Sequence, residues 1–113
     1  MAETLPQIFF KTAQKNPTRV ALRSKKNGKF SETVTWAEWE KSVRLTAKAL
    51  VQLGVQHGDR VGILAENSPA WTFSDLGSLM LGAVVVPVYP TLSSSDLSFI
   101  IKNSGMKVIL FQL

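Results

Sequence analysis

The chain has no cysteine among its 113 residues and a single histidine, His57. Without cysteine it can form no disulfide, thiolate nucleophile or cysteine-ligated metal site. A catalytic histidine needs a nucleophile and an orienting acid within reach, and a metal site needs several ligands. We therefore expect His57 to face solvent and Asp59-Arg60 to make local turn contacts or a surface ion pair. No catalytic residue and no metal ligand is assigned.

Long apolar runs are also missing. The longest stretch without charge lies between Asp75 and Asp96, and only its first part, 76–88, is mostly apolar. Pro87, Pro90 and three consecutive serines interrupt the remainder, so the stretch is too short and too broken to cross a bilayer. The first six residues lack the basic region and apolar core of a secretory signal. We expect a soluble, cytoplasmic protein.

The common nucleotide-binding signatures are absent as well. No Gly-x-Gly-x-x-Gly follows a predicted strand, and no glycine-rich stretch ends in Gly-Lys-Ser/Thr, so no cofactor-binding residue is assigned. The net charge is +5, but Lys25, Lys26 and Lys29 form the only tight basic group. A solvated hairpin tip is the favoured interpretation, and a phosphate-binding patch is the alternative. We expect no nucleic-acid partner.

Apolar residues make up 45% of the chain and charged residues 19%, as in a folded domain. Thr4-Leu5-Pro6-Gln7 is a capping box that opens a helix, and Asn16-Pro17 stops it. Strands over 20–23 and 30–35 flank Asn27-Gly28, which tolerate the positive φ of a tight turn. The pattern predicts an N-terminal helix followed by an antiparallel hairpin.

A long helix completes the predicted first part of the chain, residues 1–57. Thr35-Trp36-Ala37-Glu38 is a second capping box, and an apolar residue recurs every three or four positions through Leu50. Gly54 suits the left-handed position after the last turn. Trp36, Trp39 and Trp71 stand at helix starts, where core packing or a partner contact is favoured over stacking on bases.

Residues 58–113 predict an α/β fold, a parallel sheet of β-α-β units with right-handed crossovers. Gly62 lies inside a strand, where we expect a close-packed neighbour. The expected strands cover 61–65, 83–88 and 107–111, and the expected helices begin at Asn67-Ser68-Pro69 and at Ser93 and end at Gly82 and Gly105.

Parallel sheets place ligands at the carboxyl ends of their strands. Here these ends are 66–68 and 89–91, which precede helix starts whose free N–H groups can receive an anion. The favoured interpretation is that Asn67, Ser68 and Ser93 simply cap helices. The alternative is a stand-alone α/β binding or interaction module that holds an anion there.

The last predicted strand, 107–111, is as apolar as the strands before it, and no helix follows to cover it. From this we expect a fragment of a larger domain, cut at a subdomain edge. Such a fragment would partly self-associate, because an uncovered apolar strand favours association.

Several segments resemble adenylate-forming enzymes when taken together and in order. They are the Thr35-Trp36 helix start, 58–61, Glu66-Asn67-Ser68-Pro69-Ala70-Trp71, and 82–91. The Asn-Ser-Pro-x-Trp and Pro-x-Tyr-Pro-Thr motifs are most similar to those of long-chain fatty acid–CoA ligases. The resemblance covers essentially the whole chain and implies that it is part of the large N-terminal domain of such an enzyme.

The resemblance implies a two-step reaction in the parent enzyme. A carboxylate attacks the α-phosphorus of ATP in the presence of Mg²⁺, which gives an acyl-adenylate and pyrophosphate, and coenzyme A then displaces AMP. The family's phosphate loop, ribose-binding acid and lid lysine have no counterpart in 1–113. The segment alone is therefore expected to be inactive scaffold whose partner is the remainder of the parent chain.

The resemblance leaves alternatives for the class of acid that the parent enzyme activates. The same segments also resemble aryl-CoA ligases, relatives of luciferase and the adenylation domains of peptide assembly. Fatty acid, ATP and coenzyme A are the expected parent substrates, and the resemblance also allows peripheral contact of the parent with a membrane.

Overall fold

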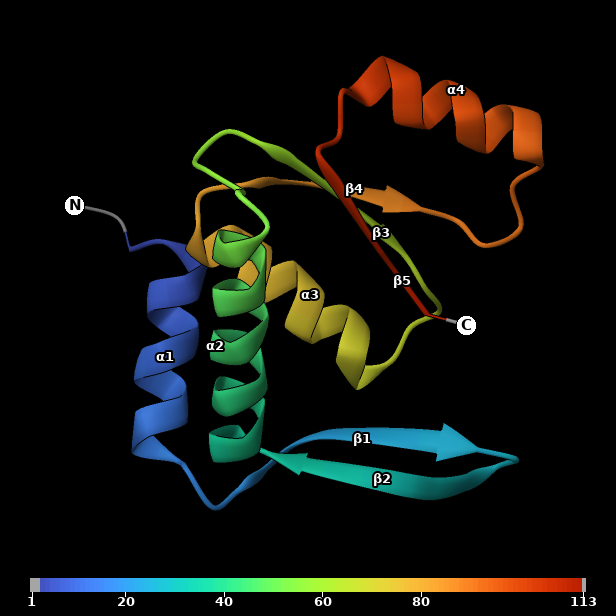
Figure 1. The fold of residues 1–113 in the computed structure, drawn as a ribbon. Coiled ribbons are helices and arrows are strands. Elements are labelled where there is room, and N and C mark those ends of the chain that lie inside the picture. The colour runs from blue at the N-terminus through green and yellow to red at the C-terminus, as the bar shows by residue number, and fades with distance from the viewer. Residues whose placement is uncertain (1–2, 113) are drawn as a thin grey trace.

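The computed structural model describes residues 3–112 and contains four helices and five strands (Figure 1). In chain order the elements are α1 (Leu5–Lys15), β1 (Val20–Lys26), β2 (Lys29–Thr35), α2 (Trp36–Gln52), β3 (Arg60–Leu64), α3 (Pro69–Met80), β4 (Val84–Val88), α4 (Ser94–Ser104) and β5 (Val108–Phe111). This is the α/β fold with an N-terminal helix, an antiparallel hairpin and a parallel sheet that the sequence predicts.

Both predicted capping boxes are present and explain where α1 and α2 begin. Thr4 Oγ1 accepts from Gln7 N at 3.3 Å, while Gln7 Oε1 accepts from Thr4 N at 2.8 Å. Thr35 and Glu38 repeat this exchange at 3.2 and 3.0 Å. Each box satisfies amide groups that the first turn of a helix cannot pair internally.

The hairpin turns at Asn27 and Gly28, whose φ angles are 54° and 77°. Two consecutive positive φ values match the turn that suits the right-handed twist of paired strands. Pairing therefore continues to the turn itself, with Lys26 opposite Lys29. As a result the strands run closer to the turn than the 20–23 and 30–35 predicted from the sequence.

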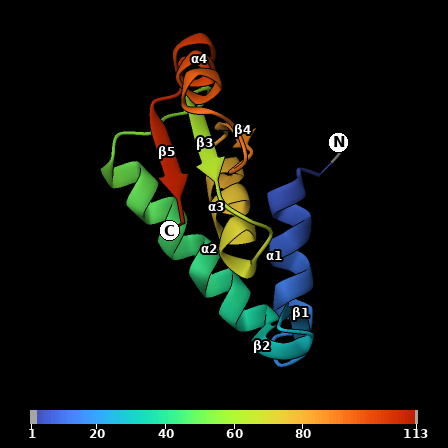
Figure 2. The same ribbon diagram turned by 90° about the vertical axis from the view of Figure 1, so that its right-hand side faces the viewer.

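The parallel sheet has the order β4-β3-β5, with β3 in the centre. Since β4 and β5 flank β3 on opposite sides, right-handed crossovers place the two connecting helices on opposite faces. Figure 1 shows α3 and α4 on opposite sides of the strands, and Figure 2 shows α4 beyond the end of the sheet where β3 begins. Pro87 lies on the edge strand β4, where its missing N–H breaks no central ladder.

Two apolar clusters make up the core. One joins the C-terminal end of α2 to the sheet, through Leu50, Val55, Val61 and Ala83. The other packs the N-terminal helices against α3, and its buried members are Phe9, Val43 and Leu76, with Phe10, Trp36, Trp39, Phe73 and Met80 partly buried around them. Trp36 and Trp39 thus serve as core residues, as expected.

Two glycines lie where neighbouring elements approach closely. A Cβ on Gly77 of α3 would lie 2.9 Å from Thr46 Cγ2 and 3.2 Å from the Ala47 backbone N, both on α2. A Cβ on Gly62 of β3 would lie 2.6 Å from Met106 Sδ. The close-packed neighbour expected at Gly62 is confirmed, whereas the helix crossing at Gly77 was not predicted.

Helices α2 and α3 end in the same way. Gly54 has φ 88°, its N–H donates to Val51 O at 3.0 Å, and the N–H of Val55 donates to Leu50 O at 3.0 Å. Gly82 has φ 70° and closes α3 with the same pair of bonds. The predicted glycine endings are confirmed, and each returns the chain directly toward the sheet.

Helix α4 and the end of strand β5 are poorly covered. No residue of α4 is buried, and Phe99 on it is 66% exposed. β5 lies at the edge of the sheet, and its last residue, Phe111, is 63% exposed. Within the described part of the chain, 3–112, no helix combines the length and the apolar character needed to cross a bilayer.

Candidate ligand cleft at the carboxyl edge of the sheet

The strand order places a topological switch point at the carboxyl ends of β3 and β5. From β3 the chain moves to β4 on one side, and from β4 it returns to β5 on the other. The connecting helices diverge there, which leaves a crevice beyond the strand ends where open α/β sheets bind ligands.

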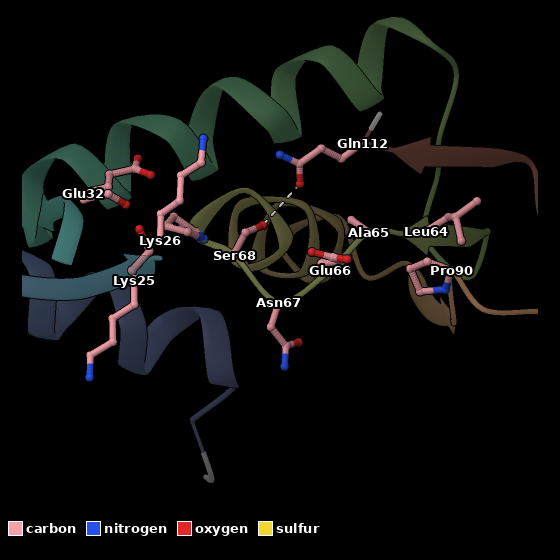
Figure 3. A pocket seen from close by; sticks show the side chains of 13 residues that line it. Lys25, Lys26, Glu32, Leu64, Ala65, Glu66, Asn67, Ser68, Pro90 and Gln112 are labelled. Atoms are coloured by element: carbon pink, nitrogen blue, oxygen red, sulfur yellow. Dashed lines mark hydrogen bonds between the residues drawn. The ribbon is translucent and has the colours of Figure 1, made fainter. Parts of the chain in front are cut away.

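A cleft of about 740 Å³ lies at this switch point, between the ends of the sheet strands and the β1–β2 hairpin (Figure 3). Its walls come from the segment that follows β3, the segments that follow β4 and β5, and both hairpin strands. The lining residues are Ser24, Lys25, Lys26, Ser31, Glu32, Leu64, Ala65, Glu66, Asn67, Ser68, Pro69, Pro90 and Gln112.

Ser68 links the carboxyl ends of β3 and β5 at the base of the cleft. Its Oγ accepts from Trp71 N at 3.3 Å and donates to Gln112 Oε1 at 3.5 Å, the dashed line in Figure 3. Gln112 N in turn donates to Leu64 O at 3.1 Å, which extends the β3–β5 ladder. The predicted capping role of Ser68 is confirmed, while Asn67 is exposed and caps nothing.

The start of α3 has little capacity left for an anion. Pro69 occupies the first helical position and has no N–H, and Trp71 N is already bonded to Ser68 Oγ. Two of the three backbone positions in the first turn are therefore unavailable. A helix start binds an anion through such free amides, so here the helix start itself contributes little.

The charged side chains around the cleft are mixed in sign. Lys25 and Lys26 come from the hairpin, and Glu32 and Glu66 stand with them in the lining. In Figure 3 the Lys25 and Lys26 side chains point in opposite directions. The arrangement favours a polar ligand that carries both positive and negative groups, or a polar protein segment, over a simple phosphate.

The predicted residues around His57 lie at the opposite, amino edge of the sheet. His57 is exposed, as expected, and its ring lies against Gly82. Asp59 makes the predicted local turn bond, since its Oδ2 accepts from Gln56 N at 2.7 Å. This backbone N–H, followed by the nearby Lys107 ammonium, lowers the pKa of the Asp59 carboxyl.

The contacts that Lys107 makes were not predicted from the sequence. Its Nζ lies 3.2 Å from Asp59 Oδ2 and donates to Gly54 O at 2.8 Å. One ammonium group therefore joins the end of α2, the start of β3 and the start of β5. The role of Lys107 is structural, because both of its contacts hold these elements together.

Other candidate residues are dispersed. Ser93 caps α4 through a bond from Asp96 N at 3.2 Å, as predicted. Trp71 is half-buried in the first turn of α3. Asp75, on the same helix, was not singled out from the sequence, and partial burial raises the pKa of its carboxyl. Within residues 3–112 no three acidic or histidine side chains gather as a metal site would need.

Comparisons with known proteins place the chain in a family. The profile of the AMP-binding enzymes matches residues 9–113. The chain is 32% identical, over 109 residues, to the long-chain-fatty-acid–CoA ligase ACSBG2 of Mus musculus. This alignment covers 96% of the present chain and 16% of the ligase. It therefore spans about one sixth of the length of that curated relative.

Solved structures agree with this assignment. The inhibitor-bound N-terminal domain of FACL13 from Mycobacterium tuberculosis superposes with a TM-score of 0.89 at 28% identity, over 97% of this chain and 27% of that one. The N-terminal subdomain of Klebsiella oxytoca NpsA, in complex with anthranilyl-AMSN, gives 0.86 at 25% identity, over 98% and 28%. The chain, with its doubly wound sheet and glycine-ended helices, therefore belongs to the AMP-binding, adenylate-forming enzymes.

Proposed function

We propose that residues 1–113 are the amino-terminal structural part of an ATP-dependent long-chain fatty acid–CoA ligase. The observation that carries the proposal is the combination of nearly complete coverage of this chain with coverage of only 16% of ACSBG2 and 27% of the FACL13 domain. A match of this kind supports a scaffold role inside a larger catalytic unit.

The reaction proposed for that unit has two steps. The fatty acid carboxylate attacks the α-phosphorus of ATP and releases pyrophosphate, and the thiol of coenzyme A then displaces AMP from the acyl-adenylate. In the described residues the acidic side chains do not converge in a group that could ligate Mg²⁺. We therefore expect the groups that bind ATP and the metal to come from polypeptide other than 1–113.

The contribution of this segment is positional. The central strand β3 and helices α2 and α3 form one packed block through the two core clusters. Close packing resists deformation, so this block provides a rigid support for the parts that carry out chemistry. The cleft beyond β3 and β5 then receives a polar segment of the same enzyme.

The first experiment asks which polypeptide carries the segment. An antibody raised against 1–113 is used to immunoprecipitate its antigen from the cells that produce it, and the precipitate is assayed for ATP–pyrophosphate exchange with a panel of acids. We expect a polypeptide several times longer than 113 residues and exchange that depends on long-chain fatty acid. An antigen of only 113 residues, or exchange by purified 1–113 alone, would overturn the proposal.

The second experiment tests the scaffold role. The segment of mouse ACSBG2 that matches this chain is replaced by it, and long-chain acyl-CoA formation is measured. We expect the chimera to be active, to lose activity with Gly77→Val at the Thr46 and Ala47 contacts, and to keep it with the exposed Lys15→Ser. A folded chimera without activity would contradict the role.

An aryl-acid ligase is the second candidate, because the chain also superposes on NpsA, whose structure contains anthranilyl-AMSN. The acid panel separates the two. Exchange with aryl acids and none with long-chain fatty acids would replace the first assignment by the second.

A further inference from the structure

The turn of the β1–β2 hairpin contains the only Asn-Gly step of the chain. The chain has four asparagines, and the residues that follow them are Pro17, Gly28, Ser68 and Ser104. Asn27 and Gly28 are both exposed, and a Cβ built on Gly28 would meet no atom within 4 Å. No side chain therefore shields the main-chain nitrogen of Gly28, which is bonded to the carbonyl carbon of Asn27.

The outer end of this hairpin is weakly held. Lys26 is paired directly with Lys29, and like charges in opposite positions destabilise a strand pair. The ladder is also irregular immediately before Lys25, and residues 25–30 are all exposed. Segments with few buried contacts open locally at a small cost in free energy. The turn can therefore open while the inner pairs, which include the buried Val34, stay closed.

Opening of the turn changes what the Asn27 side chain can reach. Among residues 3–112, Asn27 is the only residue other than glycine with a positive φ, 54°. The closed turn holds it in this left-handed conformation, which asparagine adopts more readily than most residues. An open turn releases it to other conformations, in which its Cγ can approach the nitrogen of Gly28.

We propose that Asn27 is a site of spontaneous covalent modification, which converts it to isoaspartate and remodels the hairpin wall of the cleft. The nitrogen of Gly28 attacks Cγ of Asn27 and gives up its proton. The bond from Cγ to Nδ2 breaks, and Nδ2 leaves as ammonia. The product is a cyclic imide that contains the main-chain nitrogen.

Water then opens the imide in one of two ways. Cleavage between Cγ and the nitrogen gives aspartate at position 27. Cleavage between the main-chain carbonyl carbon and the nitrogen gives isoaspartate, in which the chain continues through Cγ. Water is the only co-reactant, and nothing is oxidised or reduced. The inference rests on the hairpin alone and is independent of the proposed ligase function.

Isoaspartate at the turn has a consequence for the cleft. It adds a carbon atom to the main chain, so the two-residue turn no longer fits the ladder whose register it sets. Lys26 of β1 and Ser31 of β2 both line the cleft. A turn that cannot close moves these strand ends apart, so a covalent change at position 27 alters the wall of the cleft.

Peptide mapping of the aged protein tests the proposal. Purified 1–113 is incubated at pH 6 and at pH 8, cleaved after glutamate, and fragmented by electron transfer in a mass spectrometer, which distinguishes isoaspartate from aspartate. We expect conversion at Asn27 before any other asparagine, and faster conversion at pH 8 because the attacking nitrogen must lose its proton. Asn16 is an internal control, since the proline after it has no N–H.

Amide hydrogen exchange measures the effect on the hairpin. Asn27→Gly is the matched control, because it tolerates the positive φ and lacks the reactive amide. Exchange over residues 25–30 should become faster in the aged wild type and stay unchanged in aged N27G. Exchange at the inner pairs, 20–24 with 33–35, should stay unchanged in both.

A pair of charge variants tests the role of opening. Lys29→Glu places an opposite charge across from Lys26, whereas Lys25→Glu makes the same change of charge opposite Phe30. Since cross-strand ion pairs stabilise the closed turn, conversion in K29E should be roughly two- to fivefold slower than in K25E.

Three results would overturn the proposal. The first is conversion at Asn27 in the urea-unfolded chain and none in the folded protein, which would mean that the turn protects this residue. The second is equal exchange over residues 25–30 in the aged wild type and in aged N27G. The third is conversion at the same rate in K29E and K25E, which would exclude opening of the turn as the route.

Discussion

Replacement of Gly77 by alanine tests the packing of α3 on α2. The new methyl group would lie 2.9 Å from Thr46 Cγ2, 3.0 Å from Thr46 Cβ and 3.2 Å from the backbone N of Ala47. Thr46 cannot easily turn away, because its Oγ1 donates to Ser42 O at 2.8 Å and so holds the rotamer. The helices must therefore separate by a few tenths of an ångström.

The sign of the effect depends on two opposing contributions. Alanine favours a helix interior over glycine by about 1 kcal/mol, whereas overpacking a core costs about 1–3 kcal/mol. Since the neighbours at Gly77 are a fixed β-branched side chain and helix backbone, we take the upper part of that range. The expected net loss in free energy of unfolding is about 1–2 kcal/mol.

Urea unfolding followed by tryptophan fluorescence measures this loss as a shift of the midpoint at unchanged slope. Thr46→Ser removes the Cγ2 methyl group and keeps the hydroxyl, so G77A combined with T46S should recover part of the stability. T46S alone is the matched control that completes the cycle. If G77A is as stable as the wild type, or if T46S gives no recovery, the steric argument fails.

Three further changes probe other contacts. Thr35→Ala removes the capping oxygen of α2 and should lower the free energy of unfolding by about 1 kcal/mol in urea titration, an expectation contradicted by an unchanged midpoint. Burial raises the pKa of Asp75, so the folded state binds more protons than the unfolded state and stability falls as pH rises through that pKa. Asp75→Asn should therefore raise the melting temperature at pH 7 and leave it unchanged near pH 2. Equal effects at both pH values would disprove the burial argument. The folded state lowers the pKa of Asp59, so the contribution of this carboxylate to stability is complete above its unfolded-state pKa and is lost as pH falls through its folded-state pKa. Lys107→Met removes the ion pair with Asp59 and should lower the melting temperature at neutral pH, by a smaller amount in 1 M salt. A loss that does not depend on salt would indicate packing as the cause instead.

The sequence predicted the local parts of the fold because their causes are local. Capping boxes at Thr4 and Thr35, the positive-φ pair Asn27-Gly28, and the glycine after α2 each act within a few residues. The structure confirms all of them. The match of residues 9–113 to the AMP-binding enzymes confirms the family resemblance that the segments around β3 and β4 carry.

The parts that were missed depend on contacts between distant residues. Nothing near Lys107 indicates that it reaches Asp59 and the end of α2. The order of the strands, the approach of the hairpin to the carboxyl edge, and hence the cleft around Ser68 and Gln112, follow from how the elements pack. The hydrophobic periodicity of each segment does not specify how the elements pack. A ligand position at the carboxyl edge of the sheet was therefore predicted, but the hairpin that forms one wall of the cleft was not.

The central position of β3 has a consequence for synthesis on the ribosome. The strand that is made first in the sheet receives both of its neighbours later, because β4 and β5 follow it along the chain. Until residues up to Phe111 leave the exit tunnel, a nascent β3 has no complete set of pairing partners. Contacts of such long sequence separation slow folding, so the unpaired edges of β3 are open to association with other chains throughout this interval.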